Sequence, residues 1–423
     1  MATWSLVVAV GCHLAFVAAQ YRWPAVSSHL ILAAAGLLVL VAIAVPPAVS
    51  KDVWSYAMYG RIAGVHHVSA YTHPPDAFPR DPMLARVNPR FVDTPLVYGP
   101  GFSELAGLGA RWYQGSPLLA RLYFQALAGG ALLGSVALLV RRGTAVWVVA
   151  LVALAPGVLQ GVNAAHLDLL VGFLILAGLL LLDDERYEVG ALVVAMAVLI
   201  KIVAVPALAG AFIALVLRRR FRAAFTVAGV SGAVVGVAYL LVGGLSALGP
   251  LSQASHYVSS ASIGRLFYQG GRSLGGRPKV LIDDQSLRSF TALALAGLSF
   301  GAFAWRRRSQ ADLVTFAVGA TVVYLLTTNY ALAWYPLAIL PAAALVGNRL
   351  RWCAFGSYLL LFLADGRYLP LRGVDDHMWL FGALASFVLL ALIIWRSEMG
   401  RSGDRPTDRA PLRAGSTSAL ARN

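Results

Sequence analysis

Long apolar runs alternate with short polar gaps along most of the chain. Many of these runs approach the roughly 20 residues with which an α-helix crosses a bilayer. Pro46–Pro47 ends the run at 28–45, because proline lacks the backbone N–H that would continue a helix. The pattern predicts an all-α polytopic membrane protein of about 13 transmembrane helices, with a large first outer loop.

One run, 189–217, is too long for one helix, and it carries Lys201 near its middle. A single crossing would place Arg218–Arg220 on the opposite side from the other Arg clusters. We therefore expect two short helices that meet near Lys201 at the outer surface. The remaining predicted crossings are 4–20, 28–45, 117–140, 146–159, 164–182, 225–241, 290–305, 311–327, 334–347, 352–364 and 379–395.

The composition supports a membrane protein. The chain is 59% hydrophobic and 13% charged, whereas soluble domains carry about 25% charged residues. Its net charge of +15 does not indicate a nucleic-acid partner, because the Arg residues gather in short gaps between apolar runs, as in cytoplasmic loops. We expect one membrane-embedded domain over 1–395 and a disordered basic cytoplasmic tail over 396–423.

Two long polar segments, 46–101 and 244–288, are predicted on the outer side. The first mixes acidic, basic, aromatic and proline residues, which is typical of a binding or catalytic segment in so apolar a chain. Within it, 53–61 could form a short helix along the membrane interface, and 102–114, directly after this segment, a second one. The protein is thus expected in the cell membrane as a multi-pass protein whose active site faces outward.

Asp52 is the first candidate for chemistry. One interpretation is a helix N-cap, since Asp accepts a backbone N–H at a helix start. The other is a general base at the mouth of a cavity. Spacing alone favours the cap, and the two roles are compatible.

Other polar residues lie beside predicted helix ends. Asn163 and His166 are three residues apart and would share a helix face, for capping and interhelical hydrogen bonds or for a substrate. Lys201 either reaches the interface or meets a phosphate. Tyr330, Trp334 and Tyr335 suit an interfacial belt or a sugar-stacking wall. His66, His67 and His73 lack a matching acidic pattern, so we expect no metal. We also expect no cofactor.

The segment from Asp52 to Pro100 resembles the first outer loop of the polyprenol-phosphate-mannose-dependent α-(1→6) mannopyranosyltransferases of actinobacterial cell envelopes. The residues that carry this resemblance are DVWSY at 52–56, Gly60, Ala70-Tyr71, Asp81-Pro82 and Tyr98-Gly99-Pro100. Later matches are the 163–168 turn, Lys201-Ile202 and Trp334-Tyr335.

The resemblance implies a C-type glycosyltransferase (GT-C) membrane fold. It also implies transfer of a sugar, most simply mannose, from a polyprenyl-phosphate carrier to a glycan or glycolipid hydroxyl with inversion. Asp52 would be the base, and Lys201 with Arg265 would bind the carrier phosphate. The residues expected to bind substrate are Tyr56, Tyr98, Asn163, His166, Tyr330, Trp334 and Tyr335. A transporter, a lipid flippase and a non-catalytic membrane scaffold remain alternatives.

Overall fold

The computed structural model describes residues 2–242, 244–250, 257–259, 262, 285–364, 388 and 391–392. Every regular element in this part of the chain is helical. The α-helices are α1 (Ala2–Arg22), α2 (Ser28–Ala44), α3 (Asp52–Gly64), α4 (Pro100–Tyr113), α5 (Pro117–Arg141), α6 (Val146–Ala153), α7 (Pro156–Asn163), α8 (Asp168–Asp183), α9 (Tyr187–Ile200), α10 (Val205–Leu217), α11 (Phe221–Val242), α14 (Gln285–Arg307), α15 (Leu313–Thr327), α16 (Leu340–Ala343) and α17 (Asn348–Ala364). Short 3₁₀ turns are η1 (Pro75–Ala77), η2 (Leu84–Arg86), η3 (Pro89–Phe91), η4 (Ile202–Ala204), η5 (Gly244–Leu248), η6 (Arg308–Gln310) and η7 (Tyr335–Ala338).

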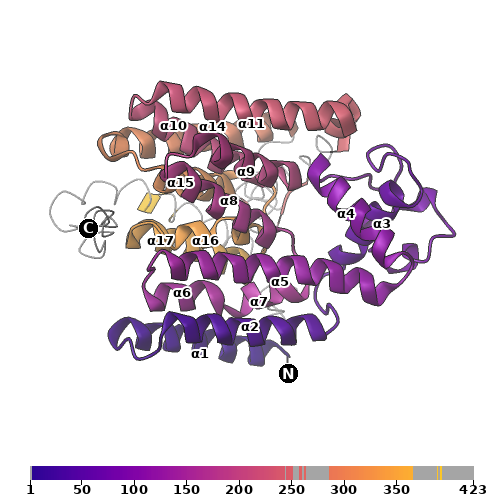
Figure 1. Cartoon of the computed structure of the whole chain (residues 1–423), viewed down its shortest axis with the longest axis horizontal. Coiled ribbons are helices and arrows are strands. Elements are labelled where there is room, and N and C mark those ends of the chain that lie inside the picture. Colours follow the sequence, from indigo (N-terminus) through magenta and orange to yellow (C-terminus); the bar gives the residue numbers. More distant parts are fainter. Residues whose placement is uncertain are drawn as a thin grey trace, which may run out of the picture.

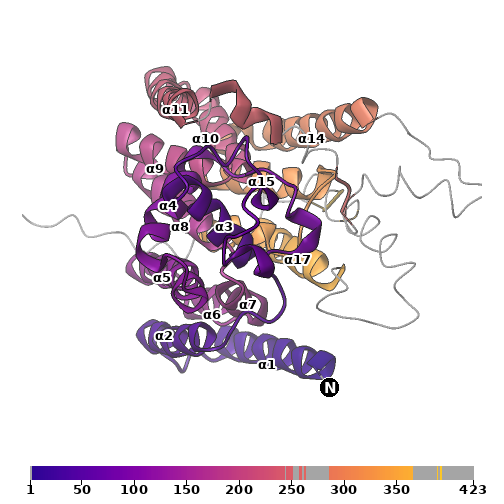
Figure 2. The same ribbon diagram turned by 90° about the vertical axis from the view of Figure 1, so that its right-hand side faces the viewer.

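Most long helices run roughly side by side, and α3 and α4 lie together at one end of the bundle (Figure 1). Seen from that end, α3, α4 and the segment between them lie in front of the bundle (Figure 2). Within the described residues, three stretches are long and apolar enough to cross a membrane: α5, α11 and Ser286–Gln310. The pair α6 and α7 would make a fourth, bent by 42° at Pro156. The count of 13 crossings stays a prediction.

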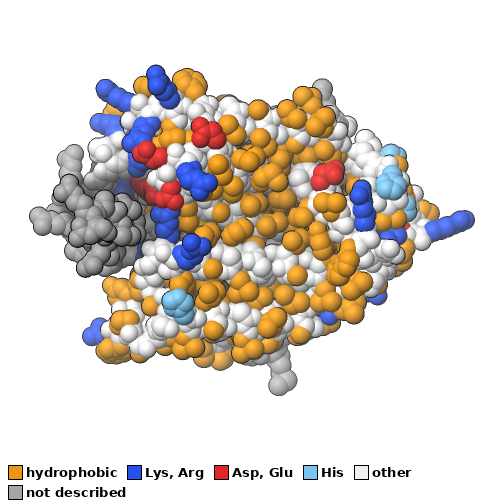
Figure 3. Space-filling model, in the orientation of Figure 1, with side chains coloured by type: hydrophobic (Ala, Val, Ile, Leu, Met, Phe, Trp, Pro, Cys, Tyr) orange, Lys and Arg blue, Asp and Glu red, His pale blue; other side chains and the backbone are white. Residues whose placement is uncertain are grey.

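The surface also fits a membrane protein. Hydrophobic side chains cover the middle of the molecule, and Lys and Arg gather toward its two ends (Figure 3). On α11, Leu240 is 73% exposed, and on α14 Leu298 is 74% exposed. Such contiguous apolar surface would be costly in water, so these helices are suited to face lipid.

Ion pairs join the Arg-rich turns at one end of the bundle. Arg142 lies 2.7 Å from Asp184, which joins the turn after α5 to the turn after α8. The turn after α10 is joined by Arg220 to Glu185 and by Arg218 to Asp312. The end of α10 thus returns to the turn before α9, and the chain reverses at Lys201, whose backbone is extended. The prediction of two short helices meeting near Lys201 is confirmed.

Nearly all residues of helix α3 are buried, and its predicted position along the membrane interface stays a prediction. Glycines let it approach α4 closely: a Cβ on Gly64 would lie 2.2 Å from the carbonyl oxygen of Gly107, and one on Gly60 would lie 2.4 Å from that of Ala106. Sequence alone gave no indication that a partner helix would cover α3.

A buried carboxylate fixes the segment that follows α3. Arg61, near the end of α3, donates from Nε to both oxygens of Asp81 at 2.9 and 2.8 Å. The Nε2 atom of His66 lies 2.7 Å from one of them, and the Met83 N–H donates to the other. The Asp81 side chain is fully buried. This network anchors the chain before it returns toward Tyr98.

Two predicted boundaries are wrong. Residues 160–163, expected as a turn, complete α7, and the turn falls at 164–167. The predicted crossing at 334–347 is instead η7 followed by the single helical turn α16. Prolines at 336 and 341 explain the interruption, since each removes a backbone donor. Most of the predicted helix 379–395 and most of the 244–288 loop lie outside the described residues.

Candidate active site

A cavity of about 580 Å³ lies between the start of α3, the segment before α4, the break between α9 and α10, and the segment after α15. Its lining joins parts of the chain that are far apart in sequence. The lining residues are Asp52, Ser55, Tyr59, Asn88, Arg90, Phe91, Thr94, Val97, Tyr98, Lys201, Ile202, Tyr257, Val258, Ser259, Tyr330, Leu332, Trp334 and Tyr335. Six of the predicted site residues are therefore brought together: Asp52, Tyr98, Lys201, Tyr330, Trp334 and Tyr335.

Asp52 is the first helical residue of α3, and its backbone N–H donates to the Ser50 hydroxyl at 3.2 Å. The N-cap position belongs to Lys51, so the interpretation of Asp52 as the N-cap residue is wrong. The Asp52 side chain is 22% exposed and opens onto the cavity. It stands in the first turn of α3, where the helix dipole is positive.

His166 lies behind Asp52. Its Nδ1 atom is 3.8 Å from Oδ2 of Asp52, and its ring stacks on Trp334 with centroids 4.1 Å apart and planes at 12°. Ala165 precedes it in a left-handed conformation, with φ of 59°. That reversal turns His166 away from α7, so the predicted shared face with Asn163 is wrong. His166 is 1% exposed and supports Asp52 and Trp334 from within the protein.

Lys201 is not the isolated cation that its apolar surroundings suggested. Its ammonium group donates to both carboxylate oxygens of Asp168 at 2.9 Å. It also lies 4.0 Å from the centroid of the Tyr335 ring. Asp168 is fully buried and Lys201 is 8% exposed. The two opposite charges neutralise each other inside the protein, and Lys201 still lines the cavity.

A close backbone contact places Tyr98 beside Lys201. The Gly99 N–H donates to the carbonyl of Ile200 at 3.2 Å, immediately before Lys201. A Cβ on Gly99 would lie 2.2 Å from the Leu199 carbonyl oxygen, so only glycine fits this contact. The Tyr71 hydroxyl donates to the Tyr98 carbonyl at 2.9 Å and holds the segment from its other side.

Three predicted substrate-binding residues do not line the cavity: His166, which lies behind Asp52, Tyr56 and Asn163. Tyr56 is fully buried behind Tyr98, with ring centroids 5.4 Å apart. Asn163 donates from Nδ2 to the carbonyls of Ala42 and Val45, at 3.0 and 2.9 Å, and so fixes the chain that leaves α2 toward Asp52. Arg265, predicted to help bind phosphate, lies outside the described residues.

Arg90 is a lining residue that sequence reasoning missed. Pro89 and Arg90 form the turn η3, which begins where Asn88 accepts the Arg90 N–H at 3.1 Å. The Arg90 side chain is exposed toward solvent and lines the cavity. An N-P-R sequence reads as an ordinary turn, and only the fold shows that this turn faces Lys201 across a cavity.

Tyr59 and Ser259 also line the cavity and were not predicted. Burial, reinforced by the Asp52 carboxylate, raises the pKa of the Tyr59 hydroxyl, which donates to the Thr94 carbonyl at 2.8 Å. Ser259 accepts the Ala331 N–H at 3.0 Å and thereby joins the 257–259 segment to the aromatic residues after α15.

The cavity thus combines one carboxylate, two cationic side chains and an aromatic wall. Such a site can accept a proton from a bound hydroxyl, neutralise an anionic group and stack on a sugar ring. Among the described residues, no group of three His, Cys, Asp or Glu side chains is placed to hold a metal ion.

Comparison with known proteins identifies one family. Residues 1–219, just over half of the chain, match the family model described as alpha-(1->6)-mannopyranosyltransferase, N-terminal domain. No curated protein matches the chain. The matched region holds Asp52, Arg90, His166, Asp168 and Lys201.

Proposed function

The chain belongs to the alpha-(1→6)-mannopyranosyltransferase family, and we propose that it transfers a mannosyl group from a polyprenyl-phosphate carrier to a hydroxyl of a cell-envelope glycan or glycolipid, with inversion. Membership of the family supports mannosyl transfer by a glycosyltransferase. The observation that carries the choice of donor is that the Asp52 carboxylate and two cations, Arg90 and Lys201, line one cavity that also has an apolar margin.

In this mechanism the oxygen of the acceptor hydroxyl attacks the anomeric carbon, and Asp52 accepts the proton of that hydroxyl. The bond from that carbon to the phosphate oxygen breaks, and polyprenyl phosphate leaves with its electron pair. His166 and the first turn of α3 hold Asp52 in place. No metal ion is required if cations neutralise the leaving phosphate.

Arg90 and Lys201 are the cations for that phosphate. Lys201 shares its charge with Asp168, so it positions the phosphate without a large excess of positive charge. Arg90 is exposed and supplies a planar pair of donors, which suits phosphate oxygens. It therefore takes the helper role that we expected of Arg265.

The carrier tail and the sugars occupy different margins of the cavity. Ile202, 43% exposed, and Leu332 border it with apolar surface suited to a prenyl chain. Tyr330, Trp334 and Tyr335 offer ring faces and edges to the sugars. Since short Arg-rich turns stay in the cytoplasm, the cavity at the other end would open on the outer face of the cell membrane.

A direct assay tests this function. Purified protein would be given radiolabelled polyprenyl-phosphate mannose or GDP-mannose, each with an oligomannoside acceptor. We expect labelled glycan from the lipid-linked donor only. If GDP-mannose gave labelled glycan and the lipid-linked donor did not, the proposed donor would be rejected. Movement of the lipid across a vesicle membrane without a new glycosidic bond would instead indicate a flippase.

A further inference from the structure

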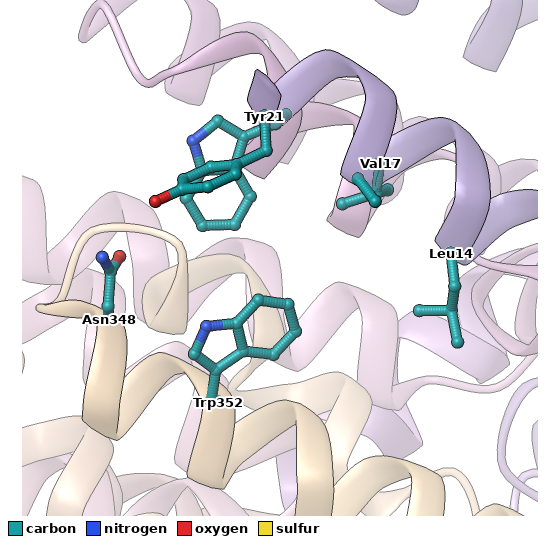
Figure 4. A pocket seen from close by; sticks show the side chains of 7 residues that line it. Leu14, Val17, Tyr21, Asn348 and Trp352 are labelled. Atoms are coloured by element: carbon teal, nitrogen blue, oxygen red, sulfur yellow. The ribbon is translucent and has the colours of Figure 1, made fainter. Parts of the chain in front are cut away.

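A second hollow lies between α1, α6 and α17, at the end of the bundle away from α3 and α4 (Figure 1). It is a groove of about 300 Å³, and Figure 4 shows Leu14, Val17 and Tyr21 of α1 facing Trp352 and Asn348 of α17. Its remaining lining residues are Ala18 and Trp147. None of these residues lines the catalytic cavity.

Aromatic rings form the end of the groove. Trp147 stacks on Trp352 with centroids 6.1 Å apart and planes at 19°, and Tyr21 meets Trp147 edge-on at 5.2 Å. Tyr21 is 66% exposed and Trp352 is 48% exposed. Tyr and Trp at the end of apolar helices are typical of the level where lipid headgroups begin. Leu14, Val17 and Ala18 give the groove an aliphatic side suited to an acyl chain, and the polar residue Asn348 lies at its border.

Positive charge borders the aromatic end. The Arg351 guanidinium lies 5.0 Å from the centroid of the Trp147 ring and donates to the Asn348 side chain at 2.8 Å. Arg22 follows Tyr21, and Arg349 follows Asn348, and both are exposed. A basic cluster beside an apolar groove attracts anionic lipid headgroups in preference to neutral ones.

We propose that this groove binds one acyl chain of an anionic phospholipid from the leaflet at the Arg-rich end, with the lipid phosphate beside Arg351 and Asn348. The aliphatic lining from Leu14 to Val17 takes the chain, and Trp147 and Trp352 flank its first carbons. The site is separate from sugar transfer and does not depend on the proposed function.

Quenching of tryptophan fluorescence by brominated lipids tests the site. The full chain would be reconstituted in neutral bilayers that contain increasing fractions of phosphatidylglycerol or phosphatidylcholine, each with brominated acyl chains. Subtracting the fluorescence of the Trp147→Phe/Trp352→Phe double variant from that of wild type gives the signal of the two groove tryptophans. We expect them to be quenched at about fivefold lower fractions of the anionic lipid, the preference that about one basic residue provides.

Matched variants give the control. Trp112, 57% exposed on α4, lies away from the groove, and the Trp112→Phe difference should show no preference between the lipids. Arg351→Gln should abolish the preference. Because Arg351 also bonds backbone carbonyls, the exposed pair Arg22→Gln/Arg349→Gln provides a second variant, which should reduce it. Equal quenching by both lipids, or no quenching of Trp147 and Trp352, would overturn the proposal.

Discussion

The ammonium group of Lys201 lies 2.9 Å from each carboxylate oxygen of Asp168, deep between α8 and the break that follows α9. Buried charges are stable only as a pair, and removal of one partner costs about 3–5 kcal/mol. Lys201→Met and Asp168→Asn should each lower the thermal stability of the purified protein markedly. The double variant should be more stable than either one. Additive losses would mean that the two residues do not act as a pair.

Donor binding separates the function of Lys201 from its structural role. In the Lys201→Met/Asp168→Asn variant the buried charges are removed together, so the fold is retained while the cavity loses a cation. We expect a raised KM for the lipid-phosphate donor, measured with the acceptor at saturation. An unchanged KM would show that Lys201 serves only the fold.

Arg90 offers a cleaner test of phosphate binding, because its side chain is exposed and its loss should not affect folding. Arg90→Gln should raise the KM for the donor by roughly tenfold or more, which corresponds to the loss of a charged hydrogen bond of about 1.5–3 kcal/mol. Arg111→Gln, an exposed site on α4 outside the cavity, is the matched control. Equal KM values for the two variants would remove Arg90 from the donor site.

Asp52→Asn tests the base. Asparagine keeps the size of the side chain and loses its basicity, so we expect donor binding to persist and turnover to fall at least roughly a hundredfold. Single-turnover measurements with labelled donor give the rate. Wild-type turnover would reject Asp52 as base and direct attention to the exposed carboxylates Asp76, Asp93 and Glu104.

The Gly99 contact predicts that a substitution at Gly99, which does not line the cavity, lowers activity. Gly99→Ala would force a Cβ to within 2.2 Å of the Leu199 carbonyl oxygen, and overpacking of this kind costs about 1–3 kcal/mol. The segment with Tyr98 should move away from Lys201, and activity should fall with stability. Gly36→Ala, in open space on α2, should leave the activity unchanged. Wild-type activity in Gly99→Ala would show that the contact is not needed.

The Asp81 network predicts a pH dependence. Burial raises the pKa of Asp81, but hydrogen bonds from Met83, His66 and Arg61 outweigh it and hold the pKa below its ordinary value. The carboxylate therefore stabilises the fold above the unfolded-state pKa, near about 3.9, and this contribution is lost as pH falls through the lower folded-state pKa. Melting temperatures below about pH 4 should fall more steeply for wild type than for Asp81→Asn, while Asp76→Asn should follow wild type.

The sequence predicted features that depend on local pattern. Apolar run length indicated the helices, and the position of the Arg clusters indicated the reversal at Lys201. The motif from Asp52 to Pro100 indicated the family, which the match over residues 1–219 confirms. These signals depend on short stretches and on the cost of charge in an apolar environment.

Features that depend on contacts between distant segments were not predicted. Asp168 pairs with Lys201 across 33 residues, and nothing in the spacing identifies that partner. The burial of α3 required α4 to cover it through Gly60 and Gly64. Arg90 lies in a turn whose sequence does not distinguish it from other turns. Its position at the cavity depends on how the Asp81 network and the Gly99 contact hold the segment between α3 and α4.

The cavity is built from two parts of the chain, one within the region that matches the family model and one beyond it. Its carboxylate and both cations lie within residues 1–219, whereas the segments 257–259 and 330–335 lie beyond the matched region. Under the proposed function, this places the catalytic groups in the matched region and part of the aromatic wall beyond it. A chimera that keeps the first part and takes the second from another family member should retain mannosyl transfer while its acceptor preference follows the donated half.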